Sequence, residues 1–283
     1  MGGNTGRTPK ARALGAELRE LRQSHGISQR ELARLVTISN ASMSRYETGD
    51  RIPTPEDVAS IVTALGEGGE LREKLIEMAR DAAQPNWLST GAAGGHNELT
   101  TLIEFERTAT HIAEVAPMIV PGLLQTSDYA RAIMADLPAA EMEPFVTLRV
   151  GRRDVLTRRR PVDFEAFIAE HVLRMPIGGH EVMADQLSHL LKFAELPNVS
   201  VRVLPTTLQR WSLVLEGAFI LFRFPKAAPI VNLQHYRSSA FLYDTADVKD
   251  YVDAVDALRE AALSPAASAE LIASCVEEME DIE

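Results

Sequence analysis

The run Ser28–Gly49 (SQRELARLVTISNASMSRYETG) constrains the fold more than any other part of the sequence. Ser28 and Ser39 suit the first position of a helix, because a hydroxyl oxygen there can accept a hydrogen bond from a free backbone N–H. Glu31 stands three residues after Ser28, as in a capping box, and Gly49 suits the end of the second helix. The run therefore predicts two short helices joined by a tight turn.

The apolar residues of this run predict which faces are buried. Leu32, Leu35 and Val36 share one face of the first helix, while Met43 and Tyr46 point inward from the second. The other face of the second helix carries small polar residues and one arginine, which suits the major groove of B-DNA. We expect a helix-turn-helix that binds DNA; a helical hairpin without that role is the alternative.

Two groups of DNA contacts follow from this arrangement. Asn40 and Arg45 lie on the exposed face of the second helix and should reach base edges, whereas flanking residues should bind mainly phosphates. The predicted DNA-contacting set is Ser28, Gln29, Ser39, Asn40, Ala41, Ser42, Ser44, Arg45 and Arg51.

The same run resembles the DNA-binding unit of the phage-repressor (Cro/XRE) family. The resemblance rests on Gln29 at the start of the first helix, Ala33 at the contact between the helices, and the ending Ser39–Gly49. It implies that the ligand is double-stranded DNA. It also implies a structural ion pair between Arg22 and Glu47 that orients the second helix; an exposed pair that contributes about 0–1 kcal/mol is the alternative.

One position departs from the family pattern. Thr37 stands in the turn where the family usually has glycine in a left-handed backbone conformation. A β-branched residue in that conformation costs about 1 kcal/mol or more. We expect either a slightly different turn or a strained Thr37.

The chain divides into two predicted domains, and its 283 residues are enough for each to bury a core. Residues 1–82 predict an all-α domain of five helices. Residues 83–98 are rich in Gly, Ala and Ser and predict a linker, and residues 99–283 predict the second domain. Besides the two helices above, the first domain should have helices over 11–24, 54–65 and 71–81.

The second domain mixes strands and helices. A strand–helix–strand unit followed by a meander of short strands predicts an α+β domain with a mixed sheet. Strands are expected over 164–173, 199–204, 219–224, 230–234 and 240–243. Helices are expected over 98–115, 127–134, 141–155, 182–194, 246–262 and 268–279.

This second domain resembles the C-terminal domain of a large actinobacterial group of helix-turn-helix regulators. In that group the domain is described as antitoxin-like, and a gene for a small protein often lies beside it. The resemblance thus implies a small protein partner encoded by an adjacent gene. The matching segments are Val120–Thr126 (VPGLLQT), Tyr129–Arg131 (YAR), Val172–Gly179 (VLRMPIGG), Gln186–Leu187 (QL) and Pro197–Pro205 (PNVSVRVLP).

The charge is unevenly distributed along the chain. The net charge is −11 at pH 7, yet residues 1–55 hold nine Lys/Arg and five Asp/Glu and carry +4, which leaves −15 for residues 56–283. Attraction to phosphate is local, because charges beyond a Debye length of about 8 Å are largely screened. A basic segment at residues 1–55 is therefore compatible with DNA binding although residues 56–283 are acidic.

The sequence contains no catalytic constellation. His180 and Glu181 begin a HExxH zinc motif, but residue 184 is alanine, and neither a phosphate-binding loop nor a G-x-S-x-G elbow occurs. Glu104, His111 and Glu114 could share one helical face, although a solvated face is commoner than a metal site. We predict no enzymatic activity, no cofactor and no metal.

The single cysteine, Cys275, excludes an internal disulfide and suits a reducing interior. No apolar run approaches 18 residues, and the start lacks the order of a signal peptide. We expect a cytoplasmic protein, associated with the nucleoid when bound to DNA, and no membrane partner.

Two clusters have open roles. The arginines of 152–160 could contact DNA or an acidic partner, or could stabilise a helix end. Leu123, Leu124 and Tyr129 could complete a core or form a partner surface, and Trp211 could line a ligand pocket or cap the core.

Together these features predict a sequence-specific transcriptional regulator that binds double-stranded DNA as a homodimer on a palindromic operator, since one helix-turn-helix reads only a few base pairs. The C-terminal domain would be a sensor or partner-binding module. The alternative is an antitoxin-like protein that mainly sequesters a small partner protein and binds DNA for autoregulation. An adjacent small open reading frame whose product co-purifies would favour that alternative.

Overall fold

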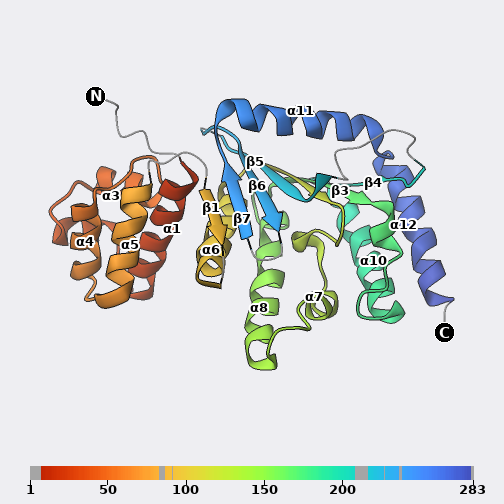
Figure 1. Ribbon diagram of the computed structural model, residues 1–283, viewed down its shortest axis with the longest axis horizontal. Coiled ribbons are helices and arrows are strands. Elements are labelled where there is room, and N and C mark those ends of the chain that lie inside the picture. Colours follow the sequence, from red (N-terminus) through yellow and green to blue (C-terminus); the bar gives the residue numbers. More distant parts are fainter. Residues whose placement is uncertain are drawn as a thin grey trace. The chain divides into compact units, whose positions relative to one another are not determined.

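The computed structural model describes residues 8–82, 87–90, 92–207, 216–225, 227–235 and 238–281. Contacts divide the chain into two compact units (Figure 1). The first unit comprises Met1–Thr108 with Lys226–Val248, and the second comprises Ala109–Pro225 with Lys249–Glu283.

The first unit begins with five helices, as the sequence predicts. Each of the first four begins after a residue whose side-chain oxygen accepts a backbone N–H, namely Thr8, Ser28, Ser39 and Thr54. Asp57 completes a capping box with Thr54. The five helices are α1 (Pro9–Ser24), α2 (Gln29–Leu35), α3 (Asn40–Glu47), α4 (Pro55–Ala64) and α5 (Gly69–Asp81).

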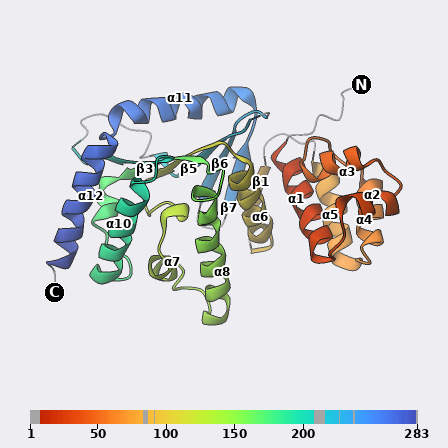
Figure 2. The same ribbon diagram turned by 180° about the vertical axis from the view of Figure 1, so that it is seen from behind.

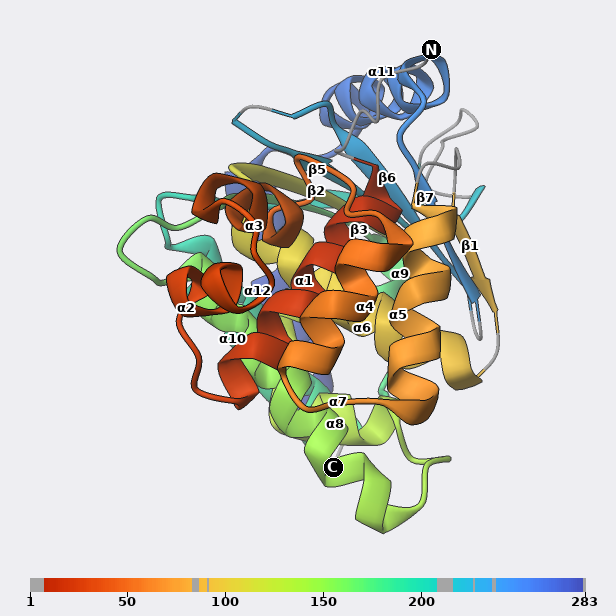
Figure 3. The same cartoon turned by 90° about the vertical axis from the view of Figure 1, so that its left-hand side faces the viewer.

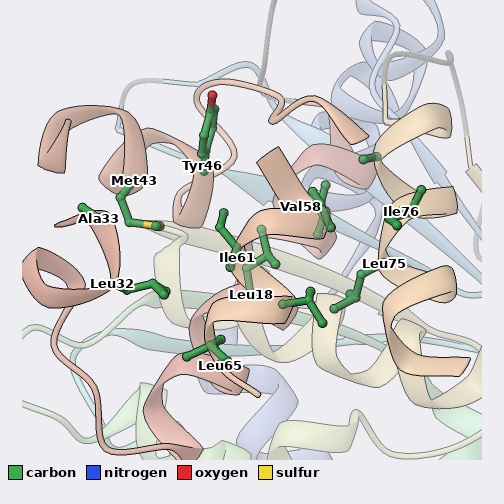
Figure 4. Close-up of a cluster of buried hydrophobic side chains, with 13 residues drawn as sticks. Leu18, Leu32, Ala33, Met43, Tyr46, Val58, Ile61, Leu65, Leu75 and Ile76 are labelled. Carbon is green, nitrogen blue, oxygen red and sulfur yellow. The ribbon is translucent and has the colours of Figure 1, made fainter. Parts of the chain in front are cut away.

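The five helices enclose a core of aliphatic side chains, with Tyr46 and Met43 contributed by α3 (Figure 4). Burial of each large apolar side chain contributes about 1.5–3 kcal/mol, so this core supplies the main stabilisation of the helical group. Helix α1 passes very close to α3, because a Cβ added at Gly15 would lie 2.4 Å from the Tyr46 carbonyl oxygen. The fully buried members include Leu14, Leu32, Met43, Val58, Ile61 and Val62.

The rest of the first unit is one helix and three strands. Helix α6 (Ala92–Thr108) packs on α1 and on strand β1 (Trp87–Thr90). Strand β7 (Ser238–Leu242) pairs antiparallel with β1 on one side and with β6 (Ile230–His235) on the other. The range 83–98, where we expected a linker, therefore contains β1 and the start of α6.

The second unit contains a mixed sheet in the order β5-β2-β3-β4, which confirms the predicted α+β class. Strand β2 (His111–Ala116) runs parallel to β3 (Asp163–Ala169), which runs parallel to β4 (Val199–Leu204). Strand β5 (Phe219–Arg223) is antiparallel to β2. Every position of β3 after Asp163 is buried, as expected for a strand covered on both faces.

Helices cover both faces of this sheet (Figures 1 and 2). Helix α11 (Thr245–Ala261) lies on one face, where Arg259 binds Glu165 of β3. Helices α7 (Ser127–Ile133), α8 (Ala139–Gly151) and α10 (His180–Ala194) lie on the other, and α12 (Pro265–Glu280) packs on α10 and β4. The short helices are η1 (Gly122–Leu124), η2 (Arg152–Leu156) and α9 (Glu170–Leu173).

Two predicted elements are wrong in part. The helix expected over 98–115 ends at Thr108, and His111–Ala116 forms β2 instead. A short apolar run cannot be assigned to helix or strand by period alone, and here pairing with β3 and β5 decides. The strand expected over 164–173 ends at Ala169, since Glu170–Leu173 turns into α9.

Candidate DNA interface

Helices α2 and α3 and the turn between them form the predicted helix-turn-helix (Figure 3). The Ser28 hydroxyl accepts a hydrogen bond from the Glu31 N–H at 3.2 Å, and the Ser39 hydroxyl accepts one from the Ser42 N–H at 3.0 Å. Both helices therefore begin at the residues that the sequence indicates.

The turn holds a threonine in a left-handed conformation. Thr37 has φ of 58°, and among the described residues it is the non-glycine residue with positive φ. The Ile38 N–H donates to the Ala33 carbonyl at 3.0 Å and closes the turn behind it. We expected either a different turn or a strained Thr37, and the positive φ is the strained conformation, which costs about 1–3 kcal/mol of folding free energy.

The exposed face of α3 carries the residues predicted to read DNA. Asn40, Ala41 and Arg45 are exposed, and Ser42 and Ser44 are half-buried beside them. Of the flanking residues, Ser28, Ser39 and Arg51 are exposed as well. The helix thus presents two hydrogen-bonding side chains of different length from one exposed surface.

The underside of α3 is fixed by a buried ion pair. Arg22 Nε lies 2.7 Å from Glu47 Oε1 and Arg22 Nη2 lies 2.9 Å from Oε2, in a bidentate geometry. The Glu47 side chain is only 3% exposed, and its hydrogen bonds raise the pKa of Arg22. The pair is therefore the structural one that the family resemblance implies, and the exposed alternative is wrong.

Two more donors complete the bonding of Glu47. Gln29 Nε2 donates to Glu47 Oε2 at 2.9 Å, and Arg19 Nη2 donates to the Glu47 carbonyl oxygen at 2.9 Å. The half-buried amide of Gln29 therefore joins the start of α2 to the end of α3, instead of pointing outward to phosphate as we expected. A buried carboxylate needs more donors than one arginine supplies, and the sequence alone does not reveal which residues provide them.

Arg19 also bonds outside the five helices. Its Nη2 atom lies 2.9 Å from Glu104 Oε1 on α6, within the same unit. Burial raises the pKa of Glu104, while the attraction of Arg19 acts against that shift. One guanidinium group is thus shared between the end of α3 and α6.

A second polar contact ties α3 to α4. The Tyr46 hydroxyl donates to Asp57 Oδ2 at 2.7 Å, and the Arg51 guanidinium lies 5.6 Å from the centre of the Tyr46 ring. Burial, together with the hydrogen bond to Asp57, raises the pKa of Tyr46 to about 12. Helix α3 is therefore held at Tyr46 and Glu47 by directional bonds.

The apolar set proposed as a partner surface lies in the core. Leu123, Leu124 and Tyr129 are all buried, and the Tyr129 hydroxyl accepts a hydrogen bond from the Val120 N–H at 3.2 Å. The turn at Pro121 directs these side chains inward, so the core alternative holds and the surface alternative is wrong. Trp211 lies outside the described residues.

The arginines of 152–160 do not form one surface. Arg153 is half-buried, where it donates to the Gln125 carbonyl at 2.8 Å and lies 5.6 Å from the centre of the Phe193 ring. Burial lowers the pKa of Arg153. Arg158 Nε donates to the Arg160 carbonyl at 2.9 Å, and Arg159 and Arg160 are exposed. The inner part of the cluster therefore serves packing.

The described part of the chain has no group of three or more His, Cys, Asp or Glu side chains placed to hold a metal ion. His111 and Glu114 lie on β2 and Glu104 lies on α6, so the shared helical face that we considered does not exist. None of the described helices is both long and apolar enough to cross a membrane.

Two solved structures show partial likeness to this chain. The clp gene regulator ClgR from C. glutamicum is 31% identical over 26% of this chain and 94% of its own, with a TM-score of 0.22. TrmBL2, an archaeal chromatin protein, is 13% identical over 69% of this chain and 59% of its own, with a TM-score of 0.31. Neither TM-score reaches 0.5, and a comparison with the curated proteins finds no match.

Two family models match the chain. The first, described as a helix-turn-helix domain, matches residues 13–75 and so includes α2, the turn and α3. This match and the geometry above make the chain a DNA-binding protein of the regulator type. The second model matches residues 99–274, which is more than half of the 283 residues. The chain therefore belongs to the family described as Domain of unknown function (DUF5753), joined here to an N-terminal helix-turn-helix domain.

Proposed function

We propose that this protein is a sequence-specific transcriptional regulator of the Cro/XRE type that binds double-stranded DNA as a homodimer on a palindromic operator. The observation that carries the proposal is the exposed face of α3, where Asn40 and Arg45 project from a helix whose underside is fixed at Tyr46 and Glu47. A fixed helix is needed because base readout depends on hydrogen bonds of defined direction.

The dimer follows from the size of the reading surface. One such helix contacts only a few base pairs, and each good bidentate contact discriminates by about 1–3 kcal/mol. Two copies related by a two-fold axis double the contacts and read an inverted repeat. The basic charge of residues 1–55 supplies the attraction to phosphates.

The proposal also assigns a separate role to each of the two domains. Residues 1–82 form the DNA-binding domain, and residues 99–283 form a sensor or partner-binding domain that acts on it. The protein works in the cytoplasm, where the operator is available.

Binding-site selection with the full chain tests the proposal. Arg45→Ala should relax base preference at one position in each half-site and weaken binding by about 1–3 kcal/mol. Arg80→Ala is the matched control, because Arg80 is an exposed arginine of α5 that pairs with Glu77. An identical consensus from wild type and Arg45→Ala would contradict the role of Arg45, and no enriched sequence from wild type would contradict the function.

A further inference from the structure

Helix α6 belongs to two parts of the chain at once. By its contacts it lies in the first compact unit, which also contains the five helices α1 to α5. By sequence, its residues from 99 onward fall in the second family match, whereas the helix-turn-helix match ends at residue 75. A contact between α6 and the helix-turn-helix therefore joins the two matched domains within one compact unit.

Helix α6 packs on α1 at two buried points. The Arg12 guanidinium lies 5.6 Å from the centre of the Phe105 ring, and both side chains are buried. One residue earlier on α6, Glu104 Oε1 lies 2.9 Å from Arg19 Nη2, in an ion pair whose side chains are 12% and 17% exposed. Phe105 also meets the Phe241 ring of β7 edge to face, at 5.4 Å between the ring centres. Helix α6 is therefore held between α1 and β7.

The guanidinium of Arg19 extends this contact to α3. The same Nη2 atom donates to the Glu47 carbonyl oxygen at 2.9 Å. Glu47 is the last residue of α3, and the last four carbonyl groups of a helix have no partner within the helix. A cation at this end also favours the negative end of the helix dipole. Arg19 therefore stabilises the C-terminal end of α3.

The bond to Glu47 alone does not hold Arg19 in place. A neutral carbonyl acceptor contributes less free energy than the rotamer entropy that a long arginine side chain loses, whereas a charged acceptor contributes about twice as much. Glu104 is that charged acceptor, and it binds the atom that also bonds α3. The direction of the Arg19 side chain therefore depends on a residue of α6.

A second arginine binds the same carboxylate without lying on α1. Arg107 Nε and Nη2 donate to Glu104 Oε2 at 3.1 Å and 3.0 Å. Arg107 lies one turn later on α6 itself, and its side chain is 51% exposed. Two arginines thus share one carboxylate, one from α1 and one from within α6, and Arg107 provides a matched control for Arg19.

We propose that Glu104 is a positioning residue for α3. Through Arg19 it fixes the end of the helix that reads DNA, and so sets the direction in which the exposed side chain of Arg45 leaves that helix. The proposal rests on the proposed function, because it takes α3 as the helix that reads bases. It goes further by giving a residue outside the helix-turn-helix match a part in that reading. Regulation by the C-terminal domain then has a defined route to α3, which is the Glu104–Arg19 pair.

DNA binding by the full chain provides the first test. Glu104→Ala should weaken binding to the operator selected by the wild type about two- to thirtyfold and relax the base preference at the Arg45 position. Affinity for random-sequence DNA should stay within about twofold, because attraction to phosphate needs no defined direction. A loss of folded protein would lower both affinities alike. Arg107→Ala should change neither, and equal effects of the two variants, or no effect of Glu104→Ala, would overturn the proposal.

A double-variant cycle provides the second test. Arg19→Ala should weaken operator binding at least as much as Glu104→Ala, and the double variant should match Arg19→Ala to within about twofold, because Glu104 acts through Arg19. Effects that multiply in the double variant would contradict this route. Where Arg19→Ala does not fold, Glu104→Gln takes its place: the amide keeps the shape without the charge, so its effect should lie between wild type and Glu104→Ala. An effect of equal size from Arg107→Gln would then count against the proposal.

Backbone hydrogen exchange of the free protein separates this proposal from the proposed function. In Glu104→Ala the last turn of α3 should exchange about two- to thirtyfold faster than in the wild type, while α4 exchanges at an unchanged rate. That result, together with a wild type that selects no DNA sequence, leaves the positioning of α3 standing and removes the function. Sequence-specific binding by the wild type, with exchange and binding unchanged in Glu104→Ala, does the reverse.

Discussion

Helices α3 and α8 use their two faces in opposite ways. Helix α3 exposes hydrogen-bonding side chains and buries the charge of Glu47 beneath them, whereas α8 buries Val146 and exposes Phe145. The first helix has to meet bases whose donors and acceptors have fixed positions. The exposed apolar side chains of α8 have no such requirement, because the hydrophobic effect has no direction.

This difference explains why a buried ion pair lies beneath α3. A buried ion pair such as Arg22–Glu47 adds little net stability compared with a well-packed apolar pair, but it allows few orientations. Helix α8 also has a directional bond on its inner side, where Arg149 Nη1 donates to Gln125 Oε1 at 3.0 Å, but the acceptor there is a neutral amide and not a buried carboxylate.

The largest expected effect is the loss of Glu47. Glu47→Ala should lower the free energy of unfolding of the helical group by about 3–5 kcal/mol, because it leaves the half-buried Arg22 without its carboxylate and removes the acceptor of Gln29. Phe145→Ala should cost less, about 1 kcal/mol, because its side chain is 43% exposed and only the remainder is removed from water. Urea unfolding of dilute protein measures both. Similar costs for the two variants would remove the contrast between the helices.

An intermediate effect is expected at Tyr46. Tyr46→Phe should cost about 1–3 kcal/mol at pH 7, because Asp57 loses its phenolic donor. The raised pKa of about 12 adds a pH dependence. Between pH 10 and 12 an unfolded tyrosine loses its proton while the folded one keeps it, so the wild type should lose stability as the pH rises through this range.

The pH dependence of Tyr46→Phe is the control for the pH dependence of the wild type. Tyr46→Phe cannot ionise at this position, so its disadvantage relative to wild type should shrink between pH 10 and 12. Melting curves at pH 8, 10 and 11 measure this change, and parallel curves for the two proteins would count against the buried hydrogen bond.

The smallest expected effect is at the turn. Thr37→Gly should stabilise the helical group by less than about 1 kcal/mol, because relief of the left-handed strain is partly offset by the greater freedom of glycine in the unfolded chain. Thr63→Gly, at an exposed position inside α4, should destabilise it instead. Thermal unfolding of the two variants should therefore move in opposite directions, and a shared direction would argue that Thr37 carries no strain.

Local signals in the sequence were sufficient for much of this fold. Ser28, Ser39 and Thr54 begin helices because the cap lies within three residues of its partner, so the pattern is complete in a short stretch. The strand Val199–Leu204 has the predicted bounds because its alternation is visible locally.

What could not be predicted depends on distant partners. Strand β1 receives its hydrogen bonds from β7, some 150 residues later in the chain, and β2 lies between β3 and β5. The role of Gln29 is missed for the same reason, because its acceptor on Glu47 is supplied by the fold. The burial of Leu124 likewise follows from the turn at Pro121.

The shared guanidinium group of Arg19 has a thermodynamic consequence. It holds the last residue of α3 with the same nitrogen that binds Glu104 on α6, and Glu104 lies within the range of the second family domain. Coupling through a shared group is reciprocal, so the free energy that a change at α6 transmits to α3 equals the free energy that the same change at α3 transmits to α6. A change at Glu104 and a change in the orientation of α3 are therefore linked through one side chain.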